Sequence, residues 1–209
     1  MQEITVKSRK QRLQQLAGYK IESRPSHLNT SIESDTEKVD CDNDVTYILG
    51  DSIIKDVKGW KLGNQFNDKT KVIVKPFSGA KIDAMNHHVI PSLNQKPNRV
   101  ILHVGTNDIP SKKTHHQICN DILSLALKMS DKTNVIISGI IEREDRYNVK
   151  VKAVNELLKS KCQERNICFI THTISPKLHL NRSNLHLNRK GTLLLSQKFV
   201  DTLKKYQNE

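Results

Sequence analysis

The sequence predicts a three-layer α/β/α sandwich around a five-stranded parallel β-sheet. Short runs of apolar residues alternate along the chain with longer segments of helical periodicity. The short runs are apolar almost throughout, as expected for strands that are buried on both faces. Strands that alternate with helices form parallel β-α units, so helices should cover both faces of the sheet. The ligand site of such a fold lies beyond the carboxyl ends of the strands.

Each expected element follows from one of these runs or segments. The strands are expected at residues 45–49, 71–74, 99–104, 134–138 and 167–170. Three segments repeat their apolar residues at the i, i+4, i+7 spacing of an amphipathic helix. These helices are expected at residues 118–129, 151–158 and 193–203. Between the first two strands, Trp60 and Phe66 are expected to lie in the core.

The first 44 residues differ from the rest of the chain. Residues 1–24 hold six Lys/Arg and two acids, whereas residues 25–44 hold one Lys and six acids. This basic-then-acidic stretch has few apolar residues, which is typical of disorder. We expect a disordered charged tail or linker over residues 1–44 and one folded domain over residues 45–209. The domain carries 27 Lys/Arg and 14 Asp/Glu, and therefore the whole charge excess.

Composition argues against several classes of protein. No apolar run approaches the roughly 18–20 residues of a membrane span, and the first residues contain no apolar stretch of signal-peptide length. The four cysteines form no C-x-x-C pair, and the histidines show no metal-ligand spacing. We therefore expect an intracellular, most simply cytoplasmic, protein with reduced thiols and with neither a metal nor an organic cofactor.

The net charge of +12 points to anionic partners. A basic protein attracts polyanions, and nucleic acid is the most common of them. Aromatic residues, at 4%, are too few to favour a base-stacking platform such as an RRM, and the basic residues are scattered. Two alternatives stay open: a surface that binds nucleic acid, or a basic surface that is only solvated.

Four glycines mark the edge at which the predicted strands end. Gly50, Gly79, Gly105 and Gly139 each follow one of these strands. Such glycines relieve backbone strain or let the chain approach a ligand closely, so four at one edge indicate a site. Ser52 comes two residues after the first of them, where the free N–H groups at the start of a helix can stabilise an anion. Taken alone, this segment fits an ordinary helix cap better.

Taken together and in this order, these segments resemble the SGNH (GDSL-type) hydrolase family. The resemblance spans residues 47–203 and implies the flavodoxin-like α/β/α fold of that family. It implies that Ser52, in Gly-Asp-Ser, is the nucleophile and that His186, before the last helix, is the general base. It also implies an oxyanion hole formed by the N–H groups of Ser52 and Gly79 and by the side-chain amide of Asn107, in Gly-Thr-Asn-Asp.

One position departs from the pattern of the family. The family places an aspartate three residues before the histidine, and Ser183 stands there. A neutral serine can orient the imidazole but brings no charge to stabilise the imidazolium. Three outcomes stay open: a slow Ser52–His186 dyad, rescue by a carboxylate such as Asp201 or Glu142, or a degenerate enzyme.

The resemblance implies a serine esterase that cleaves a small or lipid carboxylic ester through an acyl-enzyme, without a cofactor. Asp51 and Asp108 would then be structural, fixing two loops through hydrogen bonds to backbone groups. The alternative is a catalytically impaired domain that acts as a basic nucleic-acid-binding module in a retroelement-derived protein. The neutral Ser183 and the net charge of +12 favour that alternative, whereas the intact set of Ser52, Gly79, Asn107 and His186 favours the enzyme. Residues 104–109 and 187–192 also resemble the esterase-like domains of animal LINE-type retrotransposons.

Overall fold

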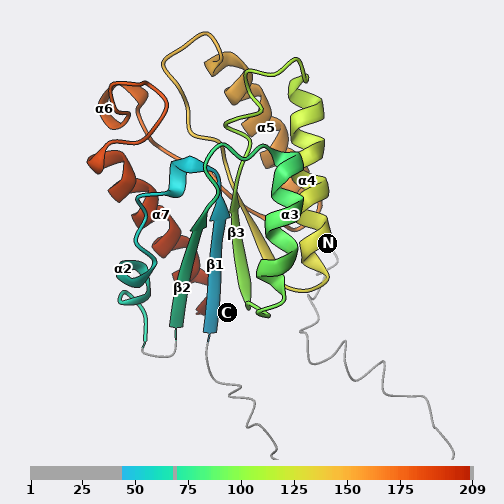
Figure 1. Ribbon diagram of the computed structural model, residues 1–209, viewed down its shortest axis with the longest axis vertical. Coiled ribbons are helices and arrows are strands. Elements are labelled where there is room, and N and C mark those ends of the chain that lie inside the picture. Colours follow the sequence, from blue (N-terminus) through green and yellow to red (C-terminus); the bar gives the residue numbers. More distant parts are fainter. Residues whose placement is uncertain (1–43, 68–69, 208–209) are drawn as a thin grey trace, which may run out of the picture. The chain divides into compact units, whose positions relative to one another are not determined.

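The computed structural model describes residues 44–67 and 70–207. The tail predicted over residues 1–44 lies outside this range except for Asp44, which begins the first strand. The described residues form one five-stranded sheet, in the order β2-β1-β3-β4-β5, with helices on both faces (Figure 1). All neighbouring strands run parallel, which confirms the predicted fold class.

All five predicted strands are present, with bounds shifted by at most two residues. The strands are β1 (Asp44–Gly50), β2 (Thr70–Pro76), β3 (Arg99–His103), β4 (Asn134–Ser138) and β5 (Cys168–Ile170). β1 lies between β2 and β3, in a register that sets Gly50 opposite both Pro76 and His103. Three neighbouring strands therefore end at the same level, and the loops that follow them start side by side.

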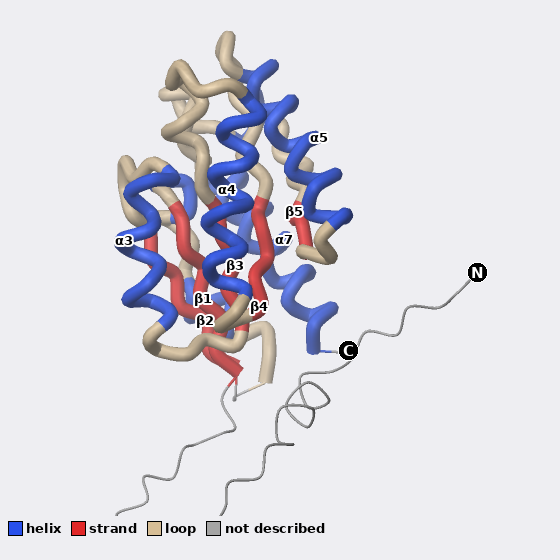
Figure 2. The backbone as a smooth tube through the Cα atoms, turned by 90° about the vertical axis from the view of Figure 1, so that its right-hand side faces the viewer, coloured by secondary structure: helices blue, strands red, loops and turns tan. Residues whose placement is uncertain are grey.

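Helices cover both faces of this sheet. They are η1 (Ser52–Ile54), α2 (Gly59–Gly63), α3 (Ile82–Leu93), α4 (His115–Ser130), α5 (Asn148–Glu164), α6 (Pro176–His179) and α7 (Arg189–Gln207). Figure 2 shows α3, α4 and α5 on one face, with α7 behind the sheet. None of the helices within residues 44–67 and 70–207 has the length and apolar character of a membrane span.

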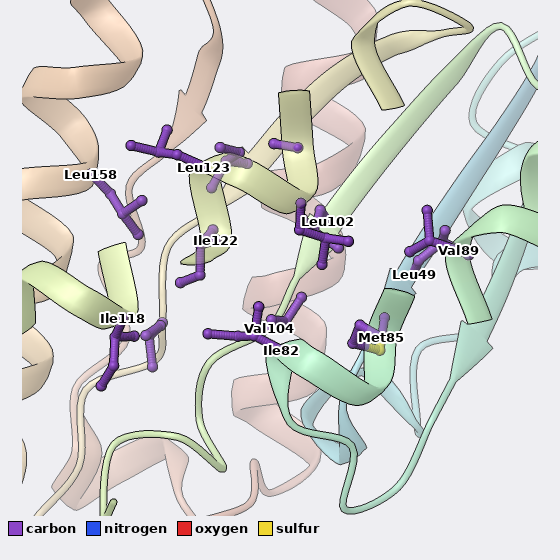
Figure 3. Close-up of a cluster of buried hydrophobic side chains, with 14 of the residues drawn as sticks. Leu49, Ile82, Met85, Val89, Leu102, Val104, Ile118, Ile122, Leu123 and Leu158 are labelled. Atoms are coloured by element: carbon purple, nitrogen blue, oxygen red, sulfur yellow. The ribbon is translucent and has the colours of Figure 1, made fainter. Parts of the chain in front are cut away.

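The central strands are buried on both faces, as their near-continuous apolar sequences predict. Leu49 and Leu102 belong to the cluster under α3, α4 and α5, part of which Figure 3 shows. Their neighbours Ile48 and Ile101 point the other way, into a cluster that includes residues of η1, α2 and α7. All four side chains are completely buried, so each face of the sheet has its own core.

Two expectations about the helical layers were wrong or incomplete. Trp60, which we expected in the core, lies on the short helix α2 with 64% of its surface exposed. Phe66 is partly buried against the cluster on the α7 face, as expected. The helix α3 was not predicted from sequence, because its polar residues and the internal Pro91 obscure the apolar spacing of its buried face.

A buried polar chain crosses the carboxyl ends of β3 and β4. The Oγ of Ser138 lies 2.8 Å from Nδ1 of His103 and 2.8 Å from Nε2 of His172. The other nitrogen of each ring is buried and has no hydrogen-bond partner among the described residues. Burial lowers the pKa of His103 to about 4. Burial, with the nearby charges of His103 and Lys198, lowers the pKa of His172 to about 3.

This chain predicts that the protein is sensitive to mild acid. Because both folded-state pKa values lie below the ordinary histidine value, the unfolded chain binds protons first as the pH falls below about 6.5. The free energy of unfolding should therefore decrease from pH 7 to pH 5, by up to about 2 kcal/mol for each histidine. Urea unfolding at the two pH values measures this decrease.

A double variant, His103→Asn with His172→Gln, keeps one hydrogen-bonding group toward Ser138 from each side and removes both titrations. Its stability should change less between pH 7 and pH 5 than that of the wild type. His116→Gln, on the exposed surface of α4, serves as the control and should keep the full decrease. If the double variant lost as much stability between pH 7 and pH 5 as the wild type, the loss could not be attributed to His103 and His172.

Candidate active site

The site begins where β1 ends. Gly50 packs so closely on β3 that a Cβ atom there would lie 2.3 Å from the carbonyl oxygen of His103, so only glycine fits. The chain then turns into η1, and the buried Asp51 caps this turn by accepting a hydrogen bond from the backbone N–H of Ile53 at 3.0 Å. Ser52 is the first residue of η1 and is half-buried. The local sequence thus holds its hydroxyl at the carboxyl edge of the sheet.

The histidine reaches this edge on a short hairpin before α7. Leu180 and Leu187 form an antiparallel bridge, and the N–H of Asn181 donates to the carbonyl of His186 at 2.8 Å. The side chain of Asn188 fixes the base of the hairpin, since its amide donates to the carbonyls of Leu178 and Leu180. The sequence analysis missed this positioning role of Asn188, for which the sequence carries no signal beyond its place before the helix.

The hairpin brings the predicted nucleophile and base together. The Oγ of Ser52 lies 3.0 Å from Nε2 of His186, although the two residues are 134 positions apart in the sequence. This distance is that of a hydrogen bond between a hydroxyl and an imidazole nitrogen. Both side chains are half-buried, so the pair is partly shielded from water and still open to a substrate.

Ser183 does not act on the imidazole in this structure. Its hydroxyl donates a hydrogen bond of 2.5 Å to Oδ1 of Asn181, which also accepts from the backbone N–H of Ser183. The residue is exposed, in a turn in which Asn184 adopts a φ of 54°. The two proposed rescuers have other partners: Asp201 accepts from Gln197, and Glu142 pairs with Lys152.

Two further loops bring polar groups toward the same edge. The loop after β2 contains Gly79, whose φ of 77° lies in the region that favours glycine, with open space where a Cβ would stand. The loop after β3 carries Asn107, whose side-chain nitrogen donates to the carbonyl of Ala80 at 3.0 Å. A carboxamide has two N–H donors, so this contact leaves the second one for another acceptor.

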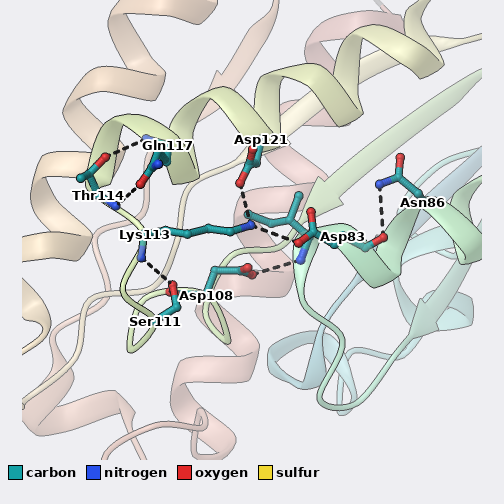
Figure 4. A network of polar contacts seen from close by, with 9 residues as sticks. Asp83, Asn86, Asp108, Ser111, Lys113, Thr114, Gln117 and Asp121 are labelled. Carbon is teal, nitrogen blue, oxygen red and sulfur yellow. Dashed lines mark hydrogen bonds and ion pairs between the residues drawn. The ribbon is translucent and has the colours of Figure 1, made fainter.

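A polar network holds these two loops in place (Figure 4). The buried carboxylate of Asp108 accepts from the N–H of Ile82, at the start of α3, at 3.1 Å. Lys113 lies between Asp121 and Asp83, at 2.9 and 3.1 Å, and the hydrogen bonds that it donates to these two carboxylates raise its pKa. Asp108 therefore has the loop-fixing geometry that the sequence analysis expected.

Asp51 places an ionisable carboxyl beside the nucleophile. It is completely buried, and this desolvation raises its pKa to about 6. The N–H of Ile53, polar groups of Thr106 and the charge of a protonated His186 each lower that pKa. The Oδ2 atom itself lacks a hydrogen bond of good geometry. When ionised, Asp51 thus places a buried negative charge next to Ser52.

Within residues 44–67 and 70–207, no group of three or more His, Cys, Asp or Glu side chains is placed to hold a metal ion. The edge of the sheet brings together the hydroxyl of Ser52, the imidazole of His186 and the side-chain amide of Asn107. Such a set is suited to attack on a carbonyl carbon, with stabilisation of the oxyanion that results.

Comparison with solved structures gives many proteins of the same fold. A lipolytic protein of the G-D-S-L family from Veillonella parvula has 20% sequence identity and a TM-score of 0.64, and the match covers 75% of this chain and 96% of that one. The lipase/acylhydrolase from Enterococcus faecalis has 18% identity and a TM-score of 0.66, over 77% and 96% of the two chains.

The psychrotrophic esterase EstA from a Pseudoalteromonas species has 17% identity and a TM-score of 0.63, over 80% of this chain and 100% of that one. The fold is therefore that of SGNH/GDSL hydrolases. No protein-family profile matches the sequence, and no curated protein sequence matches it.

The raised pKa of Asp51 predicts a stability cost at neutral pH. Because the folded protein holds this proton more tightly than the unfolded chain, the contribution of Asp51 to the free energy of unfolding falls as the pH rises from about 4 to about 6. Asp51→Asn keeps an acceptor for Ile53 and removes the charge. Relative to the wild type, the variant should gain up to about 3 kcal/mol between pH 4 and pH 7.

Urea unfolding of both proteins at pH 4 and pH 7 measures this gain. Asp56→Asn, an exposed position shortly after η1, is the matched control and should show no such gain. An equal stability difference between wild type and Asp51→Asn at both pH values would contradict the prediction.

Proposed function

We propose that this protein is a serine ester hydrolase of the SGNH type, with Ser52 as nucleophile and His186 as general base. One observation carries the proposal: the 3.0 Å contact between Ser52 Oγ and His186 Nε2 at the carboxyl edge of the sheet. The fold shared with lipolytic proteins and esterases supports it. The expected ligand crevice of a parallel sheet lies at this same edge.

The reaction follows the acyl-enzyme route. Ser52 Oγ attacks the ester carbon while Nε2 of His186 accepts the hydroxyl proton. The imidazolium then gives this proton to the leaving alkoxide, which departs as the alcohol and leaves an ester on Ser52. Water next loses a proton to His186 and attacks that ester. When the intermediate collapses, the proton returns to Ser52 and the carboxylic acid leaves.

Three donors would stabilise the oxyanion of each tetrahedral intermediate. They are the backbone N–H groups of Ser52 and Gly79 and the free amide hydrogen of Asn107. Losing one such donor typically lowers the rate by about 100- to 1,000-fold. The hydrogen bond from Asn107 to Ala80 supports this role, because it holds the amide against the loop that contains Gly79.

The proposed reaction should be slow. No carboxylate occupies the position of Ser183, and replacing the aspartate of a Ser-His-Asp protease with asparagine costs about 10,000-fold in rate. The ionised form of the buried Asp51, which directly precedes Ser52 in the chain, would offset part of this loss through its charge. We propose a small or lipid acyl or acetyl ester as substrate and no organic or metal cofactor.

A second candidate is a catalytically impaired domain that binds nucleic acid. The segment from Arg165 to Val200, which carries His186, contains six Lys/Arg and no Asp or Glu. A positive segment of this kind attracts phosphate backbones. The similarity of residues 104–109 and 187–192 to retrotransposon-encoded domains supports a retroelement-derived, intracellular protein. Retention of single-stranded nucleic acid that weakens with salt would favour this candidate.

Ser52→Ala tests the enzymatic proposal. The wild type should hydrolyse p-nitrophenyl acetate, and the variant should fall to the background rate, because it lacks the attacking hydroxyl. Ser78→Ala, at an exposed serine in the neighbouring loop, should keep the wild-type rate. Equal rates for the wild type and Ser52→Ala, with both proteins folded by circular dichroism, would reject the proposal.

Ser183→Asp tests the missing charge. A carboxylate at residue 183 would repel Oδ1 of Asn181, the present partner of the serine, and would stabilise the imidazolium of His186. The variant should hydrolyse the same ester about tenfold faster or more. Asn184→Asp, which adds the same charge one residue further along the turn, should have little effect. Equal increases in both variants would show that general charge, not the acid position, limits the rate.

A further inference from the structure

A cavity separate from the Ser52–His186 pair lies beside the edge strand β2. It has a volume of about 390 Å³ and is lined by residues of β1, by residues of β2 and α3, and by Phe77 and Gln95, which follow those two elements. The proposed ester hydrolysis uses none of them. The volume falls in the lower part of the range of about 300–1,000 Å³ that small-molecule sites occupy.

The cavity contains a lysine that has no acidic partner among the residues that the structure describes. Lys75 is half-buried, and its Nζ lies 4.4 Å from the centre of the Tyr47 ring and 3.4 Å from Oγ of Ser92. None of the residues that line the cavity is an aspartate or a glutamate. An ammonium group in such a place is available to pair with an anion from solution.

The wall next to this lysine is flat and aromatic. The rings of Phe77 and His88 stack with their centres 4.1 Å apart and their planes inclined by 11°. His87 also lines the cavity and adds a second imidazole that can donate a hydrogen bond.

We propose that this cavity binds a phosphate monoester that carries a planar ring, of which a mononucleotide is a representative. The phosphate would pair with Lys75 and accept a hydrogen bond from His87. The ring would lie against the Phe77–His88 stack, where flat ligands gain from contact with aromatic faces. The phosphate and the planar ring of the ligand would thus each contact suitable side chains within one cavity.

Direct binding measurements on the full chain test this site without depending on ester hydrolysis. Isothermal titration with AMP should give saturable 1:1 binding, and adenosine and ribose 5-phosphate should each bind at least about tenfold more weakly, since each lacks one half of the recognised chemistry. Ser52→Ala should bind AMP as the wild type does. The binding test therefore gives its result whether or not the protein hydrolyses esters.

Two variants assign the binding to this cavity. Lys75→Gln and His88→Ala should each weaken AMP binding by about tenfold or more, whereas Lys58→Gln, at an exposed lysine before α2, should not. Circular dichroism establishes whether each variant is folded. If Lys75→Gln or His88→Ala does not fold, His87→Ala is measured in its place. Absence of AMP binding at millimolar concentration, or binding that ignores all of these cavity variants, would overturn the proposal. Binding of a single-stranded oligonucleotide without binding of AMP would also overturn it, in favour of a nucleic-acid surface.

Discussion

The close approach of β1 to β3 at Gly50 is the constraint on which the site depends. A side chain at this position would collide with the carbonyl of His103, and that same carbonyl accepts a hydrogen bond from Asp51 N–H at 3.1 Å. The chain must therefore leave the sheet at Asp51, which sets Ser52 at the edge. The carbonyl of Gly50 in turn accepts from the N–H of Phe77 at 2.7 Å, so the loop after β2 is fixed to the same point.

The strands and the pairing of Ser52 with His186 were predicted for different reasons. The strands follow from burial on both faces, a pattern that a linear sequence shows directly. The pairing of Ser52 with His186 came from a family resemblance, because no local spacing relates residues 134 positions apart. The capture of Ser183 by Asn181 and the exposure of Trp60 could not be predicted, since each depends on the conformation that a short segment adopts against the rest of the fold.

The buried carboxyl at the site belongs to Asp51, next to Ser52, and not to residue 183. Burial of Asp51 disfavours its ionised form, and the neighbouring backbone and the imidazolium of His186 favour it. A carboxylate held in this way costs folding free energy at neutral pH. The proposed function asks the same carboxylate to favour positive charge on His186, so within that proposal stability and activity are opposed at one side chain.

Phe77 connects the cavity beside β2 to Gly50, two residues before Ser52. The ring of Phe77 forms part of the cavity wall, while its N–H binds Gly50 and its carbonyl accepts from Ala80 at 3.1 Å. The carbonyl of Ala80 accepts a hydrogen bond from the side-chain amide of Asn107. A continuous chain of hydrogen bonds thus joins Phe77, in the cavity wall, to Asn107, one of the proposed oxyanion donors. Because oxyanion donors act only within narrow distance limits, these hydrogen bonds fix the groups whose placement the proposed ester attack requires.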